Sequence, residues 1–399
     1  MLILEINGIC RTGGNTMFVA KPPLGWNSWN TFGEKINEEV VMQSADLLVS
    51  SGLAECGYEY IVIDDCWSLK QRDENGRLVP DPVKFPHGMK YVADYVHSKG
   101  LKFGMYSCAG MKTCAGYPGS FDHEFQDAAS FAEWGVDYLK YDYCFHPITV
   151  PGKILYKRMA AALANCGRDI VFSACSWGAD ETKKWINETG ANLWRTTGDI
   201  FDSWASIKAL SLRAPDSLGY GGINCFPDMD MLVVGMYGEG NVGLANCTDE
   251  EYRTHFSLWA LLGSPLMIGC DIRKMNDATR EILMNKEVLA INQDPAYHLS
   301  YMACSYVDRK ETDDEHPIYV RLLDNGDYAI GFFNFSDEPG NYWNSYLLLD
   351  QIGLPESTGK TLVMRDLWSG EEVKVTDGIF SPAVAAHGCR LFRCKVVDR

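Results

Sequence analysis

The stretch Val136-Asp-Tyr-Leu-Lys-Tyr-Asp-Tyr-Cys144 follows a helix-like segment, and its composition is typical of a strand. Because alternate side chains of a strand share a face, Tyr138, Lys140 and Asp142 are expected to point to one side. A lysine and an aspartate on one buried face are costly unless they pair or take part in chemistry. By itself the strand fits a structural ion pair as well as a functional site. The two interpretations can be distinguished only with the rest of the sequence.

The composition is that of a large globular chain with a net negative charge. Its 399 residues are 46% hydrophobic, which is enough for a substantial core. The formal charge of −17 argues against nucleic acid and anionic membranes as partners, since both select for lysine and arginine. No apolar run approaches the roughly 20 residues of a membrane helix. The 14 cysteines include no Cys-x₂-Cys pair, which argues against a zinc ribbon.

Residues 1–16 are interpreted as an N-terminal extension, because Met17 opens a more natural start. The extension is apolar, but it contains Glu5 and lacks the basic region of a secretory signal. We therefore expect a cytoplasmic protein, and secretion stays open as the alternative. Assembly into a homo-oligomer is also left open.

From residue 22 to residue 295 short apolar runs alternate with amphipathic stretches. The candidate strands are residues 24–29, 58–65, 101–106, 136–144, 169–175, 191–195, 229–234 with its upstream loop, and 264–269. Eight strand–helix repeats fit a (β/α)₈ TIM barrel better than an open sheet. The Gly-rich dinucleotide turn of an open doubly wound sheet is missing after the first candidate strand. We predict a catalytic barrel over residues 17–295.

The pattern changes in residues 296–399. Short candidate strands are separated by turns, with no helices between them; they cover residues 319–323, 328–333, 346–349, 361–364, 372–375 and 384–392. This pattern predicts a C-terminal antiparallel β-sandwich.

The C-terminal ends of the barrel strands build the active site in this fold. The residues expected there mix aromatic, acidic and basic side chains: Trp26, Asp64, Asp65, Tyr106, Lys140, Asp142, Cys175, Trp177, Arg195, Asp199, Asp228 and Asp230. Each carboxylate alone could cap a helix or form a salt bridge, but several strands contribute one to the same rim. Metal sites avoid positively charged side chains among their ligands, whereas the recognition of sugar hydroxyls uses both acidic and basic side chains. We therefore predict a sugar-processing site without metal or cofactor, and a metal-dependent, enolase-type barrel is the alternative.

Several motifs resemble the α-galactosidase and α-N-acetylgalactosaminidase family, glycoside hydrolase family 27. They include Leu24-Gly-Trp-Asn-Ser-Trp29, Tyr60-Ile-Val-Ile-Asp-Asp-Cys-Trp67, Leu139-Lys-Tyr-Asp142, Trp194-Arg-Thr-Thr-Gly-Asp199 and Ala290-Ile-Asn-Gln-Asp-Pro295. The resemblance implies a retaining glycosidase that hydrolyses terminal α-D-galactosyl residues, with a carbohydrate as its partner. Asp142 would be the nucleophile and Asp199 the acid/base. A retaining pair implies carboxyl groups roughly 5–5.5 Å apart.

The same resemblance implies the residues that bind the sugar. Asp64 and Asp65 would bind the 6- and 4-hydroxyls, Lys140 the 3- and 4-hydroxyls, and Arg195 the 2- and 3-hydroxyl side. The remaining assignments are Trp26, Tyr106 and Met231 as pocket walls, Asp230 as the match to the last family aspartate with Asp228 less well matched, and a disulfide between Cys114 and Cys144 beside the site.

The segment Ser173-Ala-Cys-Ser-Trp-Gly-Ala179 bears on the substituent at C2 of the sugar. Without a gap it resembles the plant-type pattern, in which Cys175 and Trp177 would close over a 2-hydroxyl. Ser176 and Ala179 also fit the spacing that makes room for an N-acetyl group. We expect an α-galactosidase, with α-N-acetylgalactosaminidase and β-L-arabinopyranosidase as alternatives, and the aglycone stays open.

Overall fold

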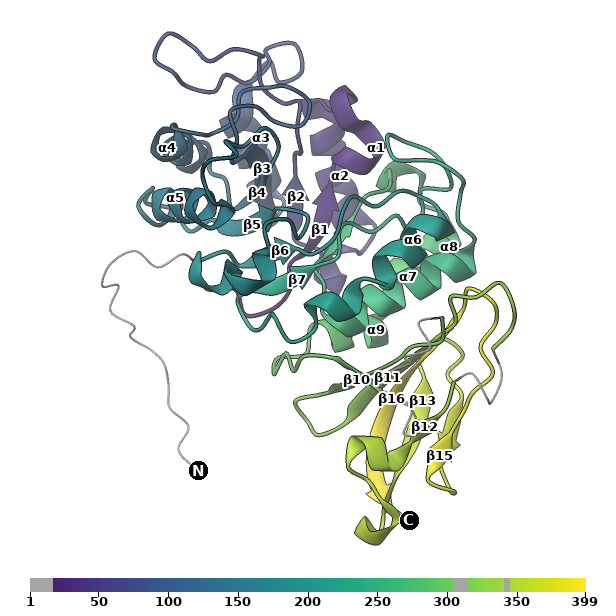
Figure 1. Cartoon of the computed structure of the whole chain (residues 1–399). Helices are drawn as coiled ribbons and strands as arrows, with labels where there is room; N and C mark the ends of the chain where they lie inside the picture. Colours follow the sequence, from purple (N-terminus) through teal and green to yellow (C-terminus); the bar gives the residue numbers. More distant parts are fainter. Residues whose placement is uncertain (1–16, 304–314, 341–344) are drawn as a thin grey trace.

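The computed structural model describes residues 17–303, 315–340 and 345–399 (Figure 1). The N-terminal extension predicted over residues 1–16 lies outside the described residues. The chain first forms a curled sheet of eight parallel strands and then a set of antiparallel strands. No helix in the described ranges is both long enough and apolar enough to cross a bilayer.

The parallel strands are neighbours in the order β7-β6-β5-β4-β3-β2-β1-β8. Their bounds are β1 Leu24–Asn27, β2 Tyr60–Val62, β3 Lys102–Cys108, β4 Tyr138–Asp142, β5 Val171–Cys175, β6 Leu193–Arg195, β7 Phe226–Asp228 and β8 Leu266–Ile268. A parallel bridge between Leu232 and Ile268 joins the chain beyond β7 to β8. This bridge closes the ring, so the predicted (β/α)₈ barrel is confirmed.

Helices surround the barrel (Figure 1). They are α1 Trp29–Phe32, α2 Glu38–Ser50, α3 Gly88–Ser98, α4 Glu124–Trp134, α5 Gly152–Ala164, α6 Trp204–Ser211, α7 Asp249–Leu262, α8 Asp277–Leu283 and α9 Lys286–Asn292. Between β5 and β6 the connection contains two short 3₁₀ turns, Thr182–Lys184 and Ile186–Glu188, in place of an α-helix. The eight repeats are therefore not uniform.

Strand β4 has the two faces that its sequence predicts. Tyr138 packs inside the barrel with Tyr60 and Val171. Leu139 and Tyr141 belong to the core between the strands and the helices. Lys140 and Asp142 share the face of Tyr138, so they come up the inside of the barrel to its carboxyl end.

The predicted seventh strand was misplaced. We expected it at residues 229–234 with the loop before them, whereas β7 is Phe226–Asp228, in that upstream loop, and only Leu232 of residues 229–234 pairs with β8. The strand ends early because Asp230 has a φ of 84°, which lies in the left-handed region and breaks an extended backbone.

The C-terminal part contains a six-stranded antiparallel sheet in the order β14-β13-β16-β11-β10-β9, and a two-stranded sheet. The strands are β9 Tyr301–Ala303, β10 Ile318–Leu322, β11 Tyr328–Phe333, β12 Leu347–Leu348, β13 Lys360–Asp366, β14 Glu372–Lys374, β15 Ile379–Phe380 and β16 Cys389–Asp398. The two sheets share one apolar core, which agrees with the predicted sandwich class. The other face of the large sheet packs on α7 of the barrel.

Candidate active site

The carboxyl ends of the strands bring most of the predicted rim residues together. Lys140, Cys175, Arg195, Asp230 and Met231 line one small cavity at this end of the barrel. The other residues that line it are Asn27, Tyr138, Ser173, Asp228 and Met267. Residues from six strands or their ends thus face one cavity, as expected if the polar side chains at the strand ends converge on one rim.

Asp142, at the end of β4, is buried and held by two donors. The backbone N–H of Tyr143 donates to its Oδ1 at 2.8 Å, and the hydroxyl of Tyr106 donates to its Oδ2 at 3.0 Å. Burial raises the pKa of Asp142 to about 6, and the nearby charge of Lys140 acts in the opposite direction. Tyr106, expected as a pocket wall, thus also orients the carboxyl group that is the predicted nucleophile.

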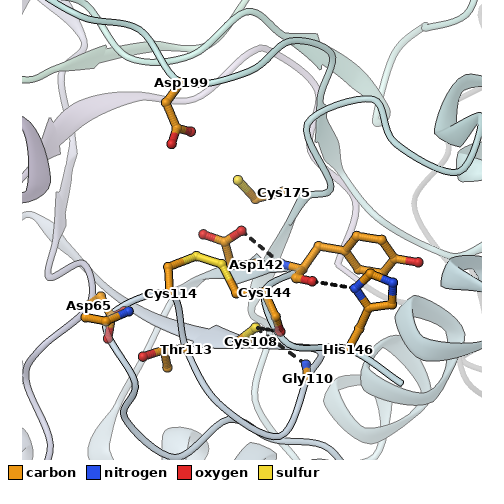
Figure 2. Close-up of a disulfide and its surroundings, with 12 residues drawn as sticks. Asp65, Cys108, Gly110, Thr113, Cys114, Asp142, Cys144, His146, Cys175 and Asp199 are labelled. Atoms are coloured by element: carbon orange, nitrogen blue, oxygen red, sulfur yellow. Dashed lines mark hydrogen bonds between the residues drawn. A yellow bond between two sulfur atoms is a disulfide. The ribbon is translucent and has the colours of Figure 1, made fainter. Parts of the chain in front are cut away.

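Asp199 differs from Asp142 because its side chain is 65% exposed. Its Oδ1 accepts a hydrogen bond from Nη2 of Arg195 at 2.8 Å. Figure 2 shows the carboxyl groups of Asp199 and Asp142 turned toward each other, with Cys175 lying between them in the view. The short separation between these carboxyl groups stays a prediction, as do their two roles.

Asp64 is the centre of a polar cluster at the rim. Lys140 donates to its Oδ2 at 2.8 Å, and so does the side-chain amide of Asn27. Asp64 is buried, and the ion pair offsets part of the cost of burying both charges. Asn27 was not among the predicted site residues, although it follows Trp26 at the end of β1, where a polar residue points to the rim.

Asp65 is held by the loop that follows β3. The N–H of Cys66 donates to its Oδ1 at 2.7 Å, and the N–H of Ala115 donates to its Oδ2 at 3.1 Å. Burial raises the pKa of Asp65. Ala115 lies next to Cys114, and the predicted disulfide between Cys114 and Cys144 is present, with 5.2 Å between the Cα atoms (Figure 2). The disulfide therefore joins the loop that holds Asp65 to the end of β4.

Arg195 is fully enclosed and binds two carboxylates through the same nitrogen. Its Nη2 donates to Asp230 at 2.6 Å and to Asp199 at 2.8 Å. Asp230 is also buried, and burial raises its pKa to about 6. The arginine thus links the exposed carboxyl group of Asp199 to a buried carboxyl group behind it.

The end of β5 favours one of the two readings of the C2 specificity segment. Cys175 is buried against Arg195, with 3.5 Å between its Sγ and Nη1. Ser176 is completely buried, and its hydroxyl pairs with that of Thr182 at 2.6 Å. Ser176 is therefore turned into the protein, so the spacing of Ser176 and Ala179 does not form an N-acetyl pocket.

Trp26 was predicted as a pocket wall, and the structure contradicts this. Its side chain is 0% exposed and packs in the core, where its indole N–H donates to the carbonyl of Cys270 at 3.0 Å. Trp29 at the start of α1 is only partly buried. Of the two tryptophans in the motif, Trp29 is therefore the one that can meet a ligand. The side of β1 that carries Trp26 packs on the helices, so the resemblance placed the wrong tryptophan of the motif at the pocket.

Potential metal ligands gather at one place within the described residues. Ligand atoms of Cys114, Asp142 and Cys144 lie within 4.8 Å of one another. The two sulfur atoms are joined in the disulfide, so they do not offer the thiolates that a metal ion needs. This cluster does not fit a metal ion.

The comparisons with known proteins agree with this geometry. The family model described as Alpha galactosidase A matches residues 21–294, and the α-galactosidase C-terminal β-sandwich domain matches residues 313–394. Alpha-galactosidase 3 of Arabidopsis thaliana is 46% identical over 387 residues, which are 97% of this chain and 82% of that protein.

Two solved structures extend the comparison. α-Galactosidase I of Mortierella vinacea has a TM-score of 0.85 and 32% identity, covering 94% of this chain and 97% of that one. A β-L-arabinopyranosidase of Geobacillus stearothermophilus has a TM-score of 0.80 and 25% identity, covering 94% and 96%. The matches cover both the barrel and the C-terminal sheets, and so the chain belongs to the α-galactosidase family, glycoside hydrolase family 27.

Proposed function

We propose that the protein is a retaining exo-glycosidase that releases terminal α-D-galactosyl residues from oligosaccharides or glycoconjugates. The single observation that carries the proposal is the pair of carboxyl groups, Asp142 and Asp199, that face each other at the mouth of the barrel (Figure 2). One is buried and held by two donors, and the other is exposed. A glycosidase needs this division, because one carboxylate attacks and the other exchanges protons with the leaving group and water.

The reaction proceeds in two displacements. Asp142 attacks the anomeric carbon while Asp199 donates its proton to the departing glycosidic oxygen, which leaves a galactosyl ester on Asp142. Asp199 then removes a proton from water, and the water oxygen displaces Asp142 from the anomeric carbon. Each displacement inverts the centre, so the product keeps the configuration of the substrate.

The polar residues around the pair select the sugar. Asp64 with Lys140, and Asp65 beside the disulfide, supply the acceptors and the cation that the hydroxyls at C3, C4 and C6 require. Cys175 and Trp177 cover the C2 side. The buried hydroxyl of Ser176 supports galactose over N-acetylgalactosamine. β-L-Arabinopyranose stays as the second candidate, because it differs only by the missing 6-hydroxymethyl group and a relative with that activity has the same fold.

The first test replaces the proposed nucleophile. We expect Asp142→Asn to lower kcat on an aryl α-galactoside by about 10⁴-fold or more, because the amide cannot form the ester intermediate. Binding of galactose should persist, since the variant keeps the shape of the side chain. Asp94→Asn removes the same charge from an exposed site on α3 and is the matched control. Near-full activity of Asp142→Asn would contradict the assignment.

The second measurement separates the substrates. Hydrolysis of an α-galactoside, an α-N-acetylgalactosaminide and a β-L-arabinopyranoside is compared at equal enzyme concentration. We expect the α-galactoside to have the highest kcat/KM and to release the α anomer first, as seen by proton NMR. Release of the β anomer would rule out the retaining mechanism.

A further inference from the structure

The end of β7 contains a sharp bend whose geometry depends on one carboxylate. Asp230 has a φ of 84°, a conformation that is strained for a residue with a side chain. Oδ1 of Asp228 accepts a hydrogen bond from the N–H of Asp230 at 2.9 Å, which is the contact of an Asx turn. On the other side, the indole N–H of Trp259 donates to the carbonyl of Asp230 at 2.8 Å. The side chain of Asp228 therefore stabilises the bend directly.

The bend determines where the carboxyl group of Asp230 points. Its Oδ1 accepts from the N–H of Met231 at 2.7 Å. Its Oδ2 accepts from Arg195 at 2.6 Å and from the N–H of Ile200 at 2.7 Å. Strand β6 and the loop that follows it are thus both bound to this one oxygen.

Those two donors both adjoin Asp199. Arg195 binds the carboxyl group of Asp199 directly, and Ile200 is the next residue in the chain. Asp199 itself is exposed, and within the described part of the chain Arg195 is the side chain that binds it. Its orientation therefore depends on Arg195 and Ile200, and their positions depend on Asp230.

We propose that Asp228 is a positioning residue for the acid/base: it acts through the bend at Asp230 and through Arg195 to set the direction of Asp199. This inference rests on the proposed function, because it needs Asp199 to protonate the leaving group. A purely structural role would place Asp228 only as a turn-forming residue, with no effect specific to proton transfer.

The leaving group separates the two roles. Methanol leaves from methyl α-galactoside only with a proton, whereas 2,4-dinitrophenolate leaves without one. General acid catalysis contributes about 10²–10⁴-fold, so a misdirected acid should cost at least about tenfold on the methyl glycoside. We expect Asp228→Ala to lower kcat/KM on the methyl glycoside by that factor and on the dinitrophenyl glycoside by less than about threefold. Equal losses on both substrates would overturn the proposal.

Two matched variants sharpen the test. Asp228→Asn keeps an oxygen that can accept from the N–H of Asp230, so the ratio of the two kcat/KM values should stay within about twofold of wild type. Thr196→Val removes a hydroxyl that donates to the main-chain carbonyl of Asp228 at 3.1 Å, and it should leave the ratio unchanged. If Asp228→Asn changed the ratio of the two kcat/KM values as much as Asp228→Ala does, the proposal would also be overturned.

Folding and function are controlled separately. If Asp228→Ala does not fold, Asp228→Ser serves in its place, because its shorter hydroxyl caps the bend more weakly and should change the ratio in the same direction. The wild-type protein must first hydrolyse both glycosides. If it hydrolyses neither, the proposed function fails, whereas an unchanged ratio in the variants defeats only the positioning role.

Discussion

At the scale of single residues, two opposing effects act on the pKa of Asp142. Burial disfavours its charge and raises its pKa to about 6, while the cation of Lys140 favours the charge. As the proposed nucleophile, Asp142 must be ionised, so the activity of the enzyme should be present above this pKa and be lost as the pH falls through it. Tyr106 adds a hydrogen bond that orients the carboxyl group.

This balance predicts an acid limb in the pH profile. Below about pH 6, kcat/KM should fall tenfold per pH unit, because the free enzyme then carries protonated Asp142. Lys140→Met removes the stabilising cation, so the limb should move to higher pH, whatever its effect on substrate binding. The profiles are measured on an aryl α-galactoside at constant ionic strength. Lys90→Met, at an exposed ion pair with Asp94, should not shift the limb; a limb that stays in place in Lys140→Met would contradict the argument.

The site residues were predictable where strand alternation decides the face. Tyr138 lies inside the barrel. Lys140 and Asp142 follow it at two-residue spacing on the same face of the strand, so they also point inward, toward the rim. Trp26 was assigned wrongly because its side of β1 packs on the helices, whereas the neighbouring Asn27 faces the cavity. Asn27 was missed because an amide that orients a carboxylate has no signal of its own in a single sequence.

At the scale of elements, β7 shows where pattern reading fails. The apolar run at residues 229–234 has the composition of a strand, yet the ladder ends at Asp228. Two contacts cause this: the Asx contact of Asp228 and the hydrogen bond from the indole of Trp259 stabilise a left-handed residue at position 230. A tertiary contact from α7 thus overrides the strand propensity of the segment.

The loop after β3 is the element that the disulfide controls. Cys114 is bonded to Cys144, and the neighbouring N–H of Ala115 binds Asp65. Without the disulfide this loop can move away, and Asp65 loses a donor that holds it toward the sugar. We expect Cys114→Ser/Cys144→Ser to raise KM for the α-galactoside by about tenfold, since a hydrogen bond to a charged group contributes roughly 1.5–3 kcal/mol.

The expected signature is a change in KM with kcat falling less. Treatment of the wild-type protein with a reductant should reproduce it, and the double variant should not respond to the reductant. Cys56→Ser removes a partly exposed free thiol and is the matched control. Unchanged KM in both the double variant and the reduced wild-type protein would show that the loop holds its place without the disulfide.

At the scale of the whole molecule, the barrel and the C-terminal sheet share a continuous core. Helix α7 packs on the sheet through β10, β11 and β16, so its side chains are buried almost all round. The sequence predicted the fold class of both parts, but it could not show that α7 contributes to the core of the barrel and to that of the C-terminal sheet. α7 can pack on the large sheet because both faces of that sheet are apolar.

Between the barrel and the C-terminal sheet lies a buried charged residue, Arg321. Arg321 on β10 is 1% exposed, and its guanidinium lies 4.9 Å from the centre of the Tyr297 ring. Tyr297 in turn packs edge-on against Phe226 of β7 and donates its hydroxyl to the carbonyl of Gly263. Among the described residues, no acceptor binds Nε, Nη1 or Nη2 of Arg321, and burial lowers its pKa.

Burying a cation of this kind costs desolvation that the Tyr297 ring and the nearby charge of Asp294 offset only in part, because a cation–π contact is worth about 2 kcal/mol when desolvated. We therefore expect Arg321→Met, which keeps the length of the side chain without the charge, to leave the free energy of unfolding unchanged or raise it by about 1 kcal/mol. Urea denaturation measures this, and kcat/KM should not change, since the catalytic rim lies at the other end of the strands from Tyr297. Arg321→Ala, which empties the same space, is the control and should destabilise by about 2 kcal/mol or more. If Arg321→Met were as destabilising as Arg321→Ala, the charge itself would be needed to join the two parts of the molecule.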